Sequence, residues 1–436
     1  MTGSNPYSAT DSLARDEDRI YTRVIWRLVP FLFLFYVVAY LDRVNIGFAK
    51  LEMLADLHFS DTIYGIGAGM FFIGYFVFEI PSNLILYRMG PRLWLACMMV
   101  IWGLLSAGMM FVKTPEVFYG LRFAIGLAEA GFFPGIIFYL TRWFPRQRRA
   151  RVTAFFMTAV AISGIVGGPL SGWIIKSCHG WYGLNGWQWL FVLEGLPSVL
   201  LGLLLPLVLD DTIHSARWLS DSEKLVLERN LVEETGQGAG ISIWGTIRQP
   251  RVWLLSVIYF LFVMGLYGIG FWLPQIIKTT GVTDVLHIGL LSAIPYSVAC
   301  VAMIKIGKNS DRTGERRWHI ALSGIGGCVG LILSGIFGDN TIVAMGALIL
   351  ATVGVLTALP IFWSLPGEFL GGMAAAVAIG LINSIGNLAG FVSPYMVGYI
   401  KDHTGSTALG LYIIAASVLL GGLLSLAGAP QKKLTN

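Results

Sequence analysis

The chain has 436 residues, of which 56% are hydrophobic and 13% are charged, and its formal net charge at pH 7 is +5. Soluble domains have about 25% charged residues, so this composition excludes a soluble globular protein and indicates a membrane protein. The six histidines and four cysteines form no motif with metal-ligand or disulfide spacing, and we expect neither a metal nor a cofactor.

Apolar runs long enough to cross ~30 Å of hydrocarbon recur along the whole chain. About twelve can be counted, and one polar stretch of about 40 residues divides them equally, which predicts an all-α membrane protein of two pseudo-symmetric six-helix bundles. The predicted division is an N-terminal tail (1–27), a first six-helix half (28–209), a linker (210–250), a second six-helix half (251–428) and a C-terminal tail (429–436).

The basic residues are distributed unequally between alternate loops. Most of the 30 Lys and Arg residues fall on the side of the N-terminus, and those expected on the other side are Lys50, Lys113, Lys176, Lys278 and Lys401. Positively charged loops remain in the cytoplasm, so we predict both termini in the cytosol and a multi-pass protein of the cell inner (cytoplasmic) membrane. The first 27 residues lack the features of a secretory signal peptide. The basic excess therefore reflects topology and does not indicate nucleic-acid binding.

Four charged residues interrupt apolar segments of the first half, namely Asp42, Arg43, Arg122 and Glu129. At 1.5 Å per residue, Asp42 lies ~21 Å and Glu129 ~20 Å from the membrane face where its segment begins. Charges at that depth cost at least a few kcal/mol and are normally kept where an ion binds or moves. Arg122 and Glu129 share one helical face and can point into one cavity, whereas Asp42 and Arg43 are about 100° apart.

These acids and arginines indicate a coupled ion-binding site. If an anion binds an arginine, the displaced carboxylate loses its partner and takes up a proton, so anion and proton binding favour one another. We therefore predict that Asp42 and Glu129 couple to protons, while Arg43 and Arg122 balance charge and contact a substrate carboxylate. The alternative is an architectural network of buried ion pairs.

Polar and aromatic residues of other segments are candidates to complete the cavity. Asn383 and Asn387 are four residues apart and share one helical face, so both amides can bind a carboxylate or hydroxyl groups of a substrate. Their alternative role is hydrogen bonding between helices. The aromatic candidates, with packing as their alternative role, are Tyr40, Tyr75, Tyr267 and Trp363. For Glu79 and Glu194, nearer the segment ends, we favour structural roles.

Short motifs mark the linker and two turns. Ser220 and Glu223 form a capping-box pattern, which predicts a short amphipathic helix in the linker. The turn at 307–317 resembles an earlier one at 83–92, and a basic turn with an acid can latch the cytosolic ends of two helices. The predicted latch residues are Asp311, Arg312, Gly314 and Arg316.

The turn at 307–317 resembles the signature of the major facilitator superfamily. Within that superfamily, the chain resembles the anion:cation symporters at residues 40–49, 80–84, 121–135, 186–197 and 382–390. The resemblance implies the major facilitator fold, transport of carboxylates such as sugar acids, tartrate, phthalate or hydroxyphenylacetate, and the roles given above for the matching acids and arginines. One departure is Tyr87-Arg88 in place of the signature's Asp-Arg, so a latch there needs an acid from elsewhere.

We therefore predict a proton-coupled symporter, monomeric in the lipid bilayer, that imports a small organic anion by alternating access. The alternative within the superfamily is a proton-coupled drug exporter, because residues 164–172 partly resemble the drug/proton antiporter motif, although Trp173 replaces its final glycine. An integral membrane enzyme is disfavoured, since no His, Cys and Asp arrangement supplies a nucleophile or metal. The identity of the carboxylate stays open, as does sodium in place of proton coupling.

Overall fold

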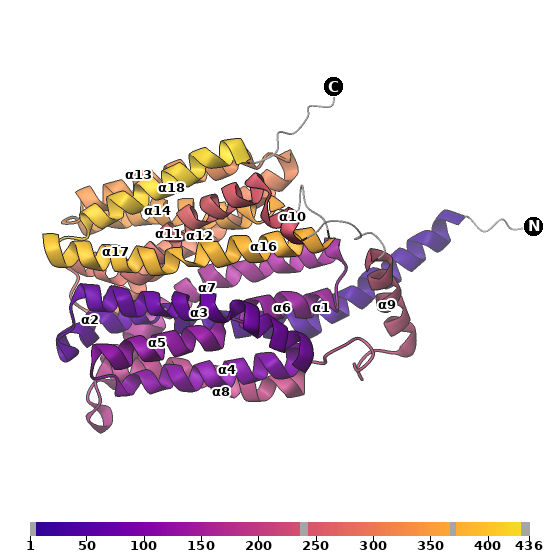
Figure 1. The fold of residues 1–436 in the computed structure, drawn as a ribbon, viewed down its shortest axis with the longest axis horizontal. Helices are drawn as coiled ribbons and strands as arrows, with labels where there is room; N and C mark the ends of the chain where they lie inside the picture. Colours follow the sequence, from indigo (N-terminus) through magenta and orange to yellow (C-terminus); the bar gives the residue numbers. More distant parts are fainter. Residues whose placement is uncertain (1–5, 236–242, 367–371, 429–436) are drawn as a thin grey trace, which may run out of the picture.

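The computed structural model describes residues 6–235, 243–366 and 372–428, and in these ranges it contains helices and turns but no strand. Within this part of the chain, 12 helical segments are long and apolar enough to cross a membrane. Figure 1 shows them lying side by side along the long axis of the molecule. The predicted tail at 429–436 lies outside the described residues.

The first set of helices precedes the linker and occupies the lower part of Figure 1. Prolines at the first position begin α4 and α5, where the missing N–H has no helical partner to lose. The helices are α1 (Pro6–Val44), α2 (Ile46–Leu57), α3 (Asp61–Met89), α4 (Pro91–Gly108), α5 (Pro115–Glu129), α6 (Phe132–Thr141), α7 (Arg146–Cys178) and α8 (Gly186–Val208), with 3-10 turns at Met109–Phe111 and Trp181–Gly183. Helix α1 thus begins within the residues assigned to the N-terminal tail.

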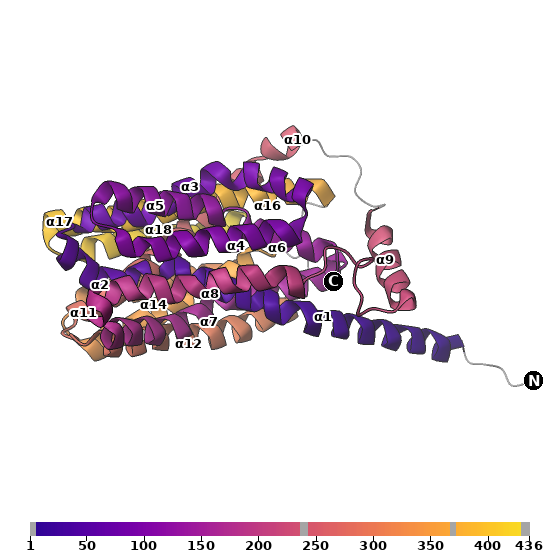
Figure 2. The same ribbon diagram turned by 90° about the horizontal axis from the view of Figure 1, so that it is seen from below.

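The linker contains α9 (Asp221–Thr235) and α10 (Ile243–Ile247), which lie at the same end of the molecule as the start of α1 and the end of α18 (Figures 1 and 2). We call this end proximal and the opposite end distal. The second set of helices comprises α11 (Pro250–Thr279), α12 (Val285–Thr313), α13 (Arg317–Ile336), α14 (Thr341–Phe362), α16 (Gly372–Asn387), α17 (Ala389–Thr404) and α18 (Ala408–Gly428).

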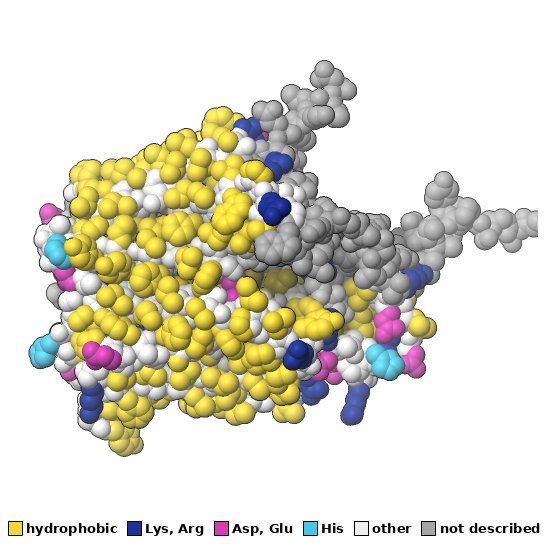
Figure 3. Space-filling view, viewed as in Figure 1, with side chains coloured by type: hydrophobic (Ala, Val, Ile, Leu, Met, Phe, Trp, Pro, Cys, Tyr) yellow, Lys and Arg dark blue, Asp and Glu magenta, His cyan; other side chains and the backbone are white. Residues whose placement is uncertain are grey.

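Hydrophobic side chains cover most of the face of the molecule that Figure 3 shows, and charged side chains gather toward its two ends. Large apolar residues such as Ile80, Leu207 and Ile342 are 72%, 78% and 85% exposed. An apolar surface of this extent is unfavourable in water and favourable against lipid chains. The distribution fits a protein whose helices cross the bilayer from proximal to distal end.

Three of the spans are interrupted close to the residues singled out in the sequence. Helix α1 ends at Val44, directly after Arg43, and α5 ends at Glu129. Helix α16 likewise ends at Asn387. The break after Glu129 has a local cause, because Pro134 has no N–H to donate to Ala130. Asn45, Ala130 and Leu388, which follow these helix ends, keep right-handed helical dihedral angles, so each break is a local irregularity within a continuing span.

The two sets of helices touch through glycines at the distal end. A Cβ added to Gly398 of α17 would lie 2.2 Å from the Asp61 carbonyl oxygen at the start of α3. A Cβ on Gly289 of α12 would lie 2.2 Å from the carbonyl oxygen of Gly168 in α7. Such spacing admits only glycine, so the backbones of the two halves are in direct contact here.

The linker is attached to the proximal end by polar contacts. Its predicted capping box is present, since the Ser220 amide donates to Glu223 and the Glu223 amide donates to the Ser220 hydroxyl. Glu223 also pairs with Arg23 of α1 at 3.1 Å. The turn after α3 takes its acid from Asp211, whose carboxylate accepts the Arg92 amide at 3.1 Å. The linker therefore supplies the acid that the sequence lacks in that turn.

Candidate substrate and proton site

A cavity of about 660 Å³ lies between the two sets of helices. Among the predicted substrate residues, those that line it are Tyr40, Arg43, Tyr75, Tyr267, Trp363, Asn383 and Asn387. Further lining residues that the sequence analysis did not single out are Tyr36, Phe133, Met157, Val160, Tyr259, Leu266, Met303, Leu356, Leu359 and Pro360. Apart from Arg43, the described lining residues are uncharged.

Arg43 is held by partners from both halves. Its guanidinium donates to the Glu129 carboxylate of α5, with which it forms a buried ion pair. It also donates to the Tyr267 hydroxyl of α11 at 3.0 Å. The rings of Tyr40 and Tyr75 lie 5.5 Å and 5.7 Å from its central carbon, within cation–π range. One Glu129 oxygen, Oε2, has no hydrogen-bond partner among the described residues. The Arg43 guanidinium is thus a cation presented to the cavity, with a carboxylate partner that an anion can replace.

Arg122 does not line this cavity, contrary to the expectation that it shares one with Glu129. Its guanidinium donates to the carbonyl oxygens of Gly67 at 3.4 Å and Ala68 at 3.5 Å, in α3. The centroid of the Phe71 ring lies 5.1 Å from the Arg122 guanidinium and 5.3 Å from the Arg43 guanidinium, so this ring of α3 contacts both cations. Glu129 is also absent from the described lining and reaches the cavity only through its pair with Arg43.

Asp42 also faces away from the main cavity. Its carboxylate accepts hydrogen bonds from the Ser198 hydroxyl at 2.8 Å, the Ser106 hydroxyl at 2.9 Å and the Trp102 indole at 3.2 Å. These donors come from α4 and α8, within the first set of helices. The separation of about 100° between adjacent helical positions explains why Arg43 faces the cavity and Asp42 does not.

Glu79 connects the two halves beside the cavity. Its carboxylate accepts from the Asn383 amide at 3.0 Å and from the Ser384 hydroxyl at 2.6 Å, both on α16. The other predicted amide, Asn387, remains in the cavity wall with 8% exposure. These contacts give Glu79 a structural role as a link between the halves. The apolar sequence around Glu79 does not indicate which residues it contacts.

An ion network closes the distal end around Asp61. Its carboxylate pairs with Lys50 of α2 at 2.6 Å and with Lys401 of α17 at 3.0 Å. Lys50 Nζ also lies 3.1 Å from the centroid of the Trp272 ring in α11. Asp402 of α17 accepts the backbone amides of Asp61 and Thr62 at the start of α3. A further pair between halves joins Lys176 and Asp284.

The predicted latch residues lie together at the proximal ends of α12 and α13. Asp311 pairs with Arg316 at 2.7 Å, and Arg316 also donates to the Ser310 hydroxyl at 2.9 Å. Arg312 donates to the side-chain oxygen of Asn309 at 3.1 Å. Gly314 ends α12 with φ +66°, the left-handed conformation that favours glycine. The contacts of Arg316 join the start of α13 to the end of α12, whereas the contact between Arg312 and Asn309 lies within α12.

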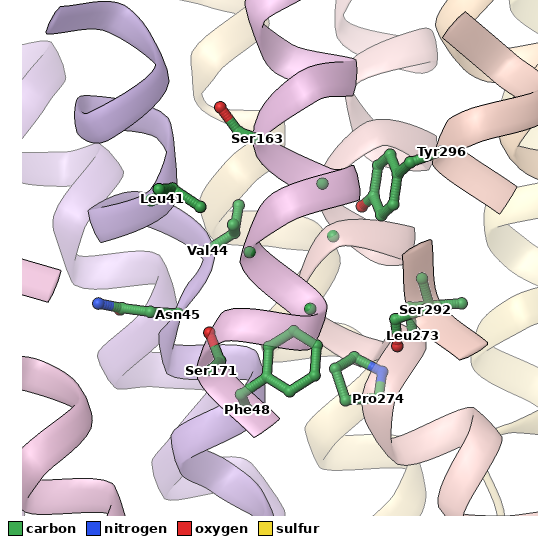
Figure 4. A pocket seen from close by; sticks show the side chains of 14 residues that line it. Leu41, Val44, Asn45, Phe48, Ser163, Ser171, Leu273, Pro274, Ser292 and Tyr296 are labelled. Carbon is green, nitrogen blue, oxygen red and sulfur yellow. The ribbon is translucent and has the colours of Figure 1, made fainter. Parts of the chain in front are cut away.

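A second cavity of about 350 Å³ lies between α1, α7, α11 and α12, nearer the distal end (Figure 4). Its polar lining comes from Asn45, Ser163, Ser171, Ser292 and Tyr296. Figure 4 shows the Asn45 carboxamide directed away from Tyr296 and Pro274. In the described ranges, no group of three or more His, Cys, Asp and Glu residues is arranged to hold a metal ion.

The chain resembles known transporters over nearly its whole length. A model of the Major Facilitator Superfamily matches residues 32–394. A protein of Agrobacterium vitis named "Putative tartrate transporter" is 46% identical, and the match covers 94% of each chain. "Putative metabolite transport protein NicT" of Pseudomonas putida is 45% identical, again over 94% of each chain. A "Quinolone resistance transporter" of Acinetobacter baumannii is 40% identical over 94% of each chain.

Solved structures share the fold at low sequence identity. The xylose transporter XylE from E. coli, in a partially occluded inward-open conformation, has a TM-score of 0.75 and 15% identity, with 93% of this chain and 100% of that chain covered. These comparisons confirm the predicted major facilitator fold, and they confirm that the chain is a transporter and not an enzyme. The chain belongs to the Major Facilitator Superfamily.

Proposed function

We propose that this transporter is a proton-coupled symporter that imports a small organic anion. The proposal depends on the position of Arg43. Arg43 is the charged residue of the described cavity lining, and it contacts Glu129 in one half and Tyr267 in the other. A guanidinium binds carboxylates with paired N–H donors. A substrate carboxylate that reaches Arg43 competes directly with Glu129.

Proton coupling follows from the burial of that ion pair. Glu129 is 1% exposed and its described cationic partner is Arg43. A carboxylate that loses its cation in such surroundings is costly, and binding a proton removes the charge. Anion binding and protonation of Glu129 therefore favour each other, and the empty transporter returns with the original ion pair restored.

Alternating access requires that each end of the cavity open in turn. The glycine contacts and the Asp61 network support a conformation with the distal end closed. Arg43 and Tyr267 join the two halves at the cavity itself, so the bond between them is exchanged for substrate contacts as the halves move. With the proximal end assigned to the cytosol by its basic loops, this conformation faces inward in the inner membrane, and the unit of transport is the monomer.

The cavity wall favours a substrate with hydroxyl or aromatic groups beside its carboxylate. Tyr40, Tyr75 and Trp363 offer ring faces, and Asn387 offers an amide. Relatives named for tartrate transport, at 46% identity, support a hydroxy-dicarboxylate. Aromatic acids and sugar acids fit the same chemistry, since each presents a carboxylate with groups that stack or hydrogen-bond.

Export of drugs is the second candidate function. It is favoured by the aromatic lining and by the relative named as a quinolone resistance transporter. Proteoliposomes containing the purified protein separate the two. Accumulation of labelled L-tartrate, or of another carboxylate in a set, driven by an inward proton gradient supports import. Proton-driven efflux of a quinolone or a cationic dye, without carboxylate accumulation, supports export and contradicts our proposal.

A further inference from the structure

A second buried acid, Glu194 of α8, lies in the same polar cluster as Asp42. Glu194 is 3% exposed and Asp42 is 2% exposed. The Asn45 carboxamide lies beside Asp42, with its Nδ2 3.5 Å from Asp42 Oδ1. Ser198, which is one helical turn from Glu194 on α8, donates to Asp42 at 2.8 Å. The two acids therefore lie in one buried cluster.

The hydrogen bonds to these two carboxyls are unequal. Asp42 accepts two hydroxyls and an indole N–H, which together suit a charged carboxylate. Glu194 accepts one described hydrogen bond, from the Ser171 hydroxyl to Oε1 at 2.7 Å. Its other oxygen, Oε2, is buried without a described partner, and so is the carbonyl oxygen of Asn45. A proton on Glu194 Oε2 supplies the donor that these two acceptors lack.

No described cation pairs with either acid. The groups that face them are Asp42 from α1, Asn45 from the break before α2, Trp102 and Ser106 from α4, Ser171 from α7 and Ser198 from α8. Two charged residues of α5 also act on Asp42 electrostatically. One is Glu129, which is paired with Arg43, and the other is Arg122, which is bonded to carbonyl oxygens of α3. Two adjacent buried carboxylates without a cation would repel each other, so the pair requires at least one proton.

The pair borders the second cavity and not the main one. Asn45 and Ser171 both contribute to the lining of the second cavity, and each also contacts an acid of the pair (Figure 4). The main cavity wall includes neither acid. The pair is therefore spatially separate from the proposed substrate site at Arg43.

We propose that Asp42 and Glu194 share one proton, which rests on Glu194 in this conformation. On transfer, the O–H bond at Glu194 breaks and an O–H bond forms at Asp42, while the negative charge moves to Glu194. Asn45 is a positioning residue for the Asp42 carboxyl. The inference rests on the proposed proton coupling, and it adds Glu194 to the residues that hold the coupled proton.

Infrared spectroscopy of the purified protein tests the resting place of the proton without any substrate. Glu194→Gln should remove a carbonyl band of a protonated carboxylic acid, whereas Asp42→Asn and the exposed control Glu116→Gln should retain it. Ser171→Ala, which deletes the hydrogen bond to Glu194, should shift the same band and serves if Glu194→Gln does not fold. An unchanged band in both Glu194→Gln and Ser171→Ala overturns the inference.

Transport assays test the role of that proton. In proteoliposomes with labelled L-tartrate, or whichever carboxylate the wild type accumulates, Glu194→Gln should reduce proton-driven accumulation roughly tenfold and leave counterflow exchange within about twofold. A wild type that shows no proton-driven accumulation contradicts the proposed function, and the infrared result is then judged alone. A wild type that accumulates substrate, together with a Glu194→Gln variant that accumulates it equally, refutes the shared proton.

Discussion

Arg43 of α1 donates a hydrogen bond of 3.0 Å to the hydroxyl of Tyr267 in α11, and this contact joins the two halves at the wall of the main cavity. The same guanidinium is paired with Glu129. In the function that we propose, substrate binding, proton binding and the relative position of the halves therefore meet at one side chain.

Substitution of Arg43 should weaken substrate binding more than substitution of Tyr267. Arg43→Lys keeps a positive charge but loses the paired donors, and we expect a rise in Kd of about tenfold to a hundredfold. Tyr267→Phe removes one hydrogen bond and should raise Kd about threefold to tenfold. Calorimetric titration with the transported carboxylate measures both. Tyr182→Phe, on a side chain that is 94% exposed, is the matched control. Unchanged affinity in Arg43→Lys would remove Arg43 from the substrate site.

Neutral substitutions of the two predicted proton-coupling acids should separate exchange from accumulation. Asp42→Asn and Glu129→Gln cannot release a proton, so uptake against a gradient should stop while counterflow exchange continues. The exposed residue Asp339 provides the control substitution Asp339→Asn, which should accumulate substrate normally. Normal concentrative uptake in both Asp42→Asn and Glu129→Gln would contradict their coupling role.

Weakening the Asp61 network should favour opening of the distal end. Asp61→Asn removes the ion pairs with Lys50, whose side chain is buried, and with Lys401, which is partly exposed. In a chain without its native cysteines, a reporter Tyr395→Cys lies at the contact of α3 and α17, beside Gly65. Its reaction with a membrane-impermeant maleimide should increase about twofold to fivefold. An unchanged rate would show that the glycine contacts alone keep this end closed.

The Lys176–Asp284 pair should contribute equally to distal closure at pH 5.5 and pH 7.5. The hydrogen bond from Lys176 lowers the pKa of Asp284 below its usual value of 3.8. Because the pKa of Asp284 is lowered, the ionised carboxylate contributes its full stabilisation at every pH above the usual pKa. This stabilisation is lost only as the pH falls through the lowered pKa. Asp284→Asn should therefore raise the labelling of a Leu286→Cys reporter by the same factor at both pH values. A larger effect at one of them would make this pair a pH sensor.

Several parts of the site could be predicted from the sequence because they depend on local geometry. The helical positions of Arg43, Tyr40 and Asn387 are fixed by their segments, and all three line the cavity. The divergence of Asp42 from Arg43 follows from the helical angle alone. The turn near Arg92 lacks the Asp of the superfamily signature, so an acid from elsewhere in the chain was expected there. Asp211 of the linker supplies it.

Other parts depend on neighbours that the sequence does not reveal. Arg122 is seven residues from Glu129 on α5, yet it donates to carbonyl oxygens of α3 and is not among the residues that line the main cavity. Hydroxyl donors such as Ser106 and Ser198 bind Asp42 across helices, although lone serines in apolar segments have no distinctive spacing. The same holds for Asp61 and Lys401, which are far apart in the sequence and meet only through the packing of α3 and α17.

Proton uptake on substrate binding is the most direct test of the account. Calorimetric titrations of the purified wild type with its carboxylate, in buffers of different ionisation enthalpy, measure the protons bound per substrate. We predict net proton uptake in the wild type and a clear reduction of that uptake in Glu129→Gln, with binding retained. Binding heats that are independent of the buffer in the wild type would contradict the exchange of Glu129 for a substrate anion at Arg43.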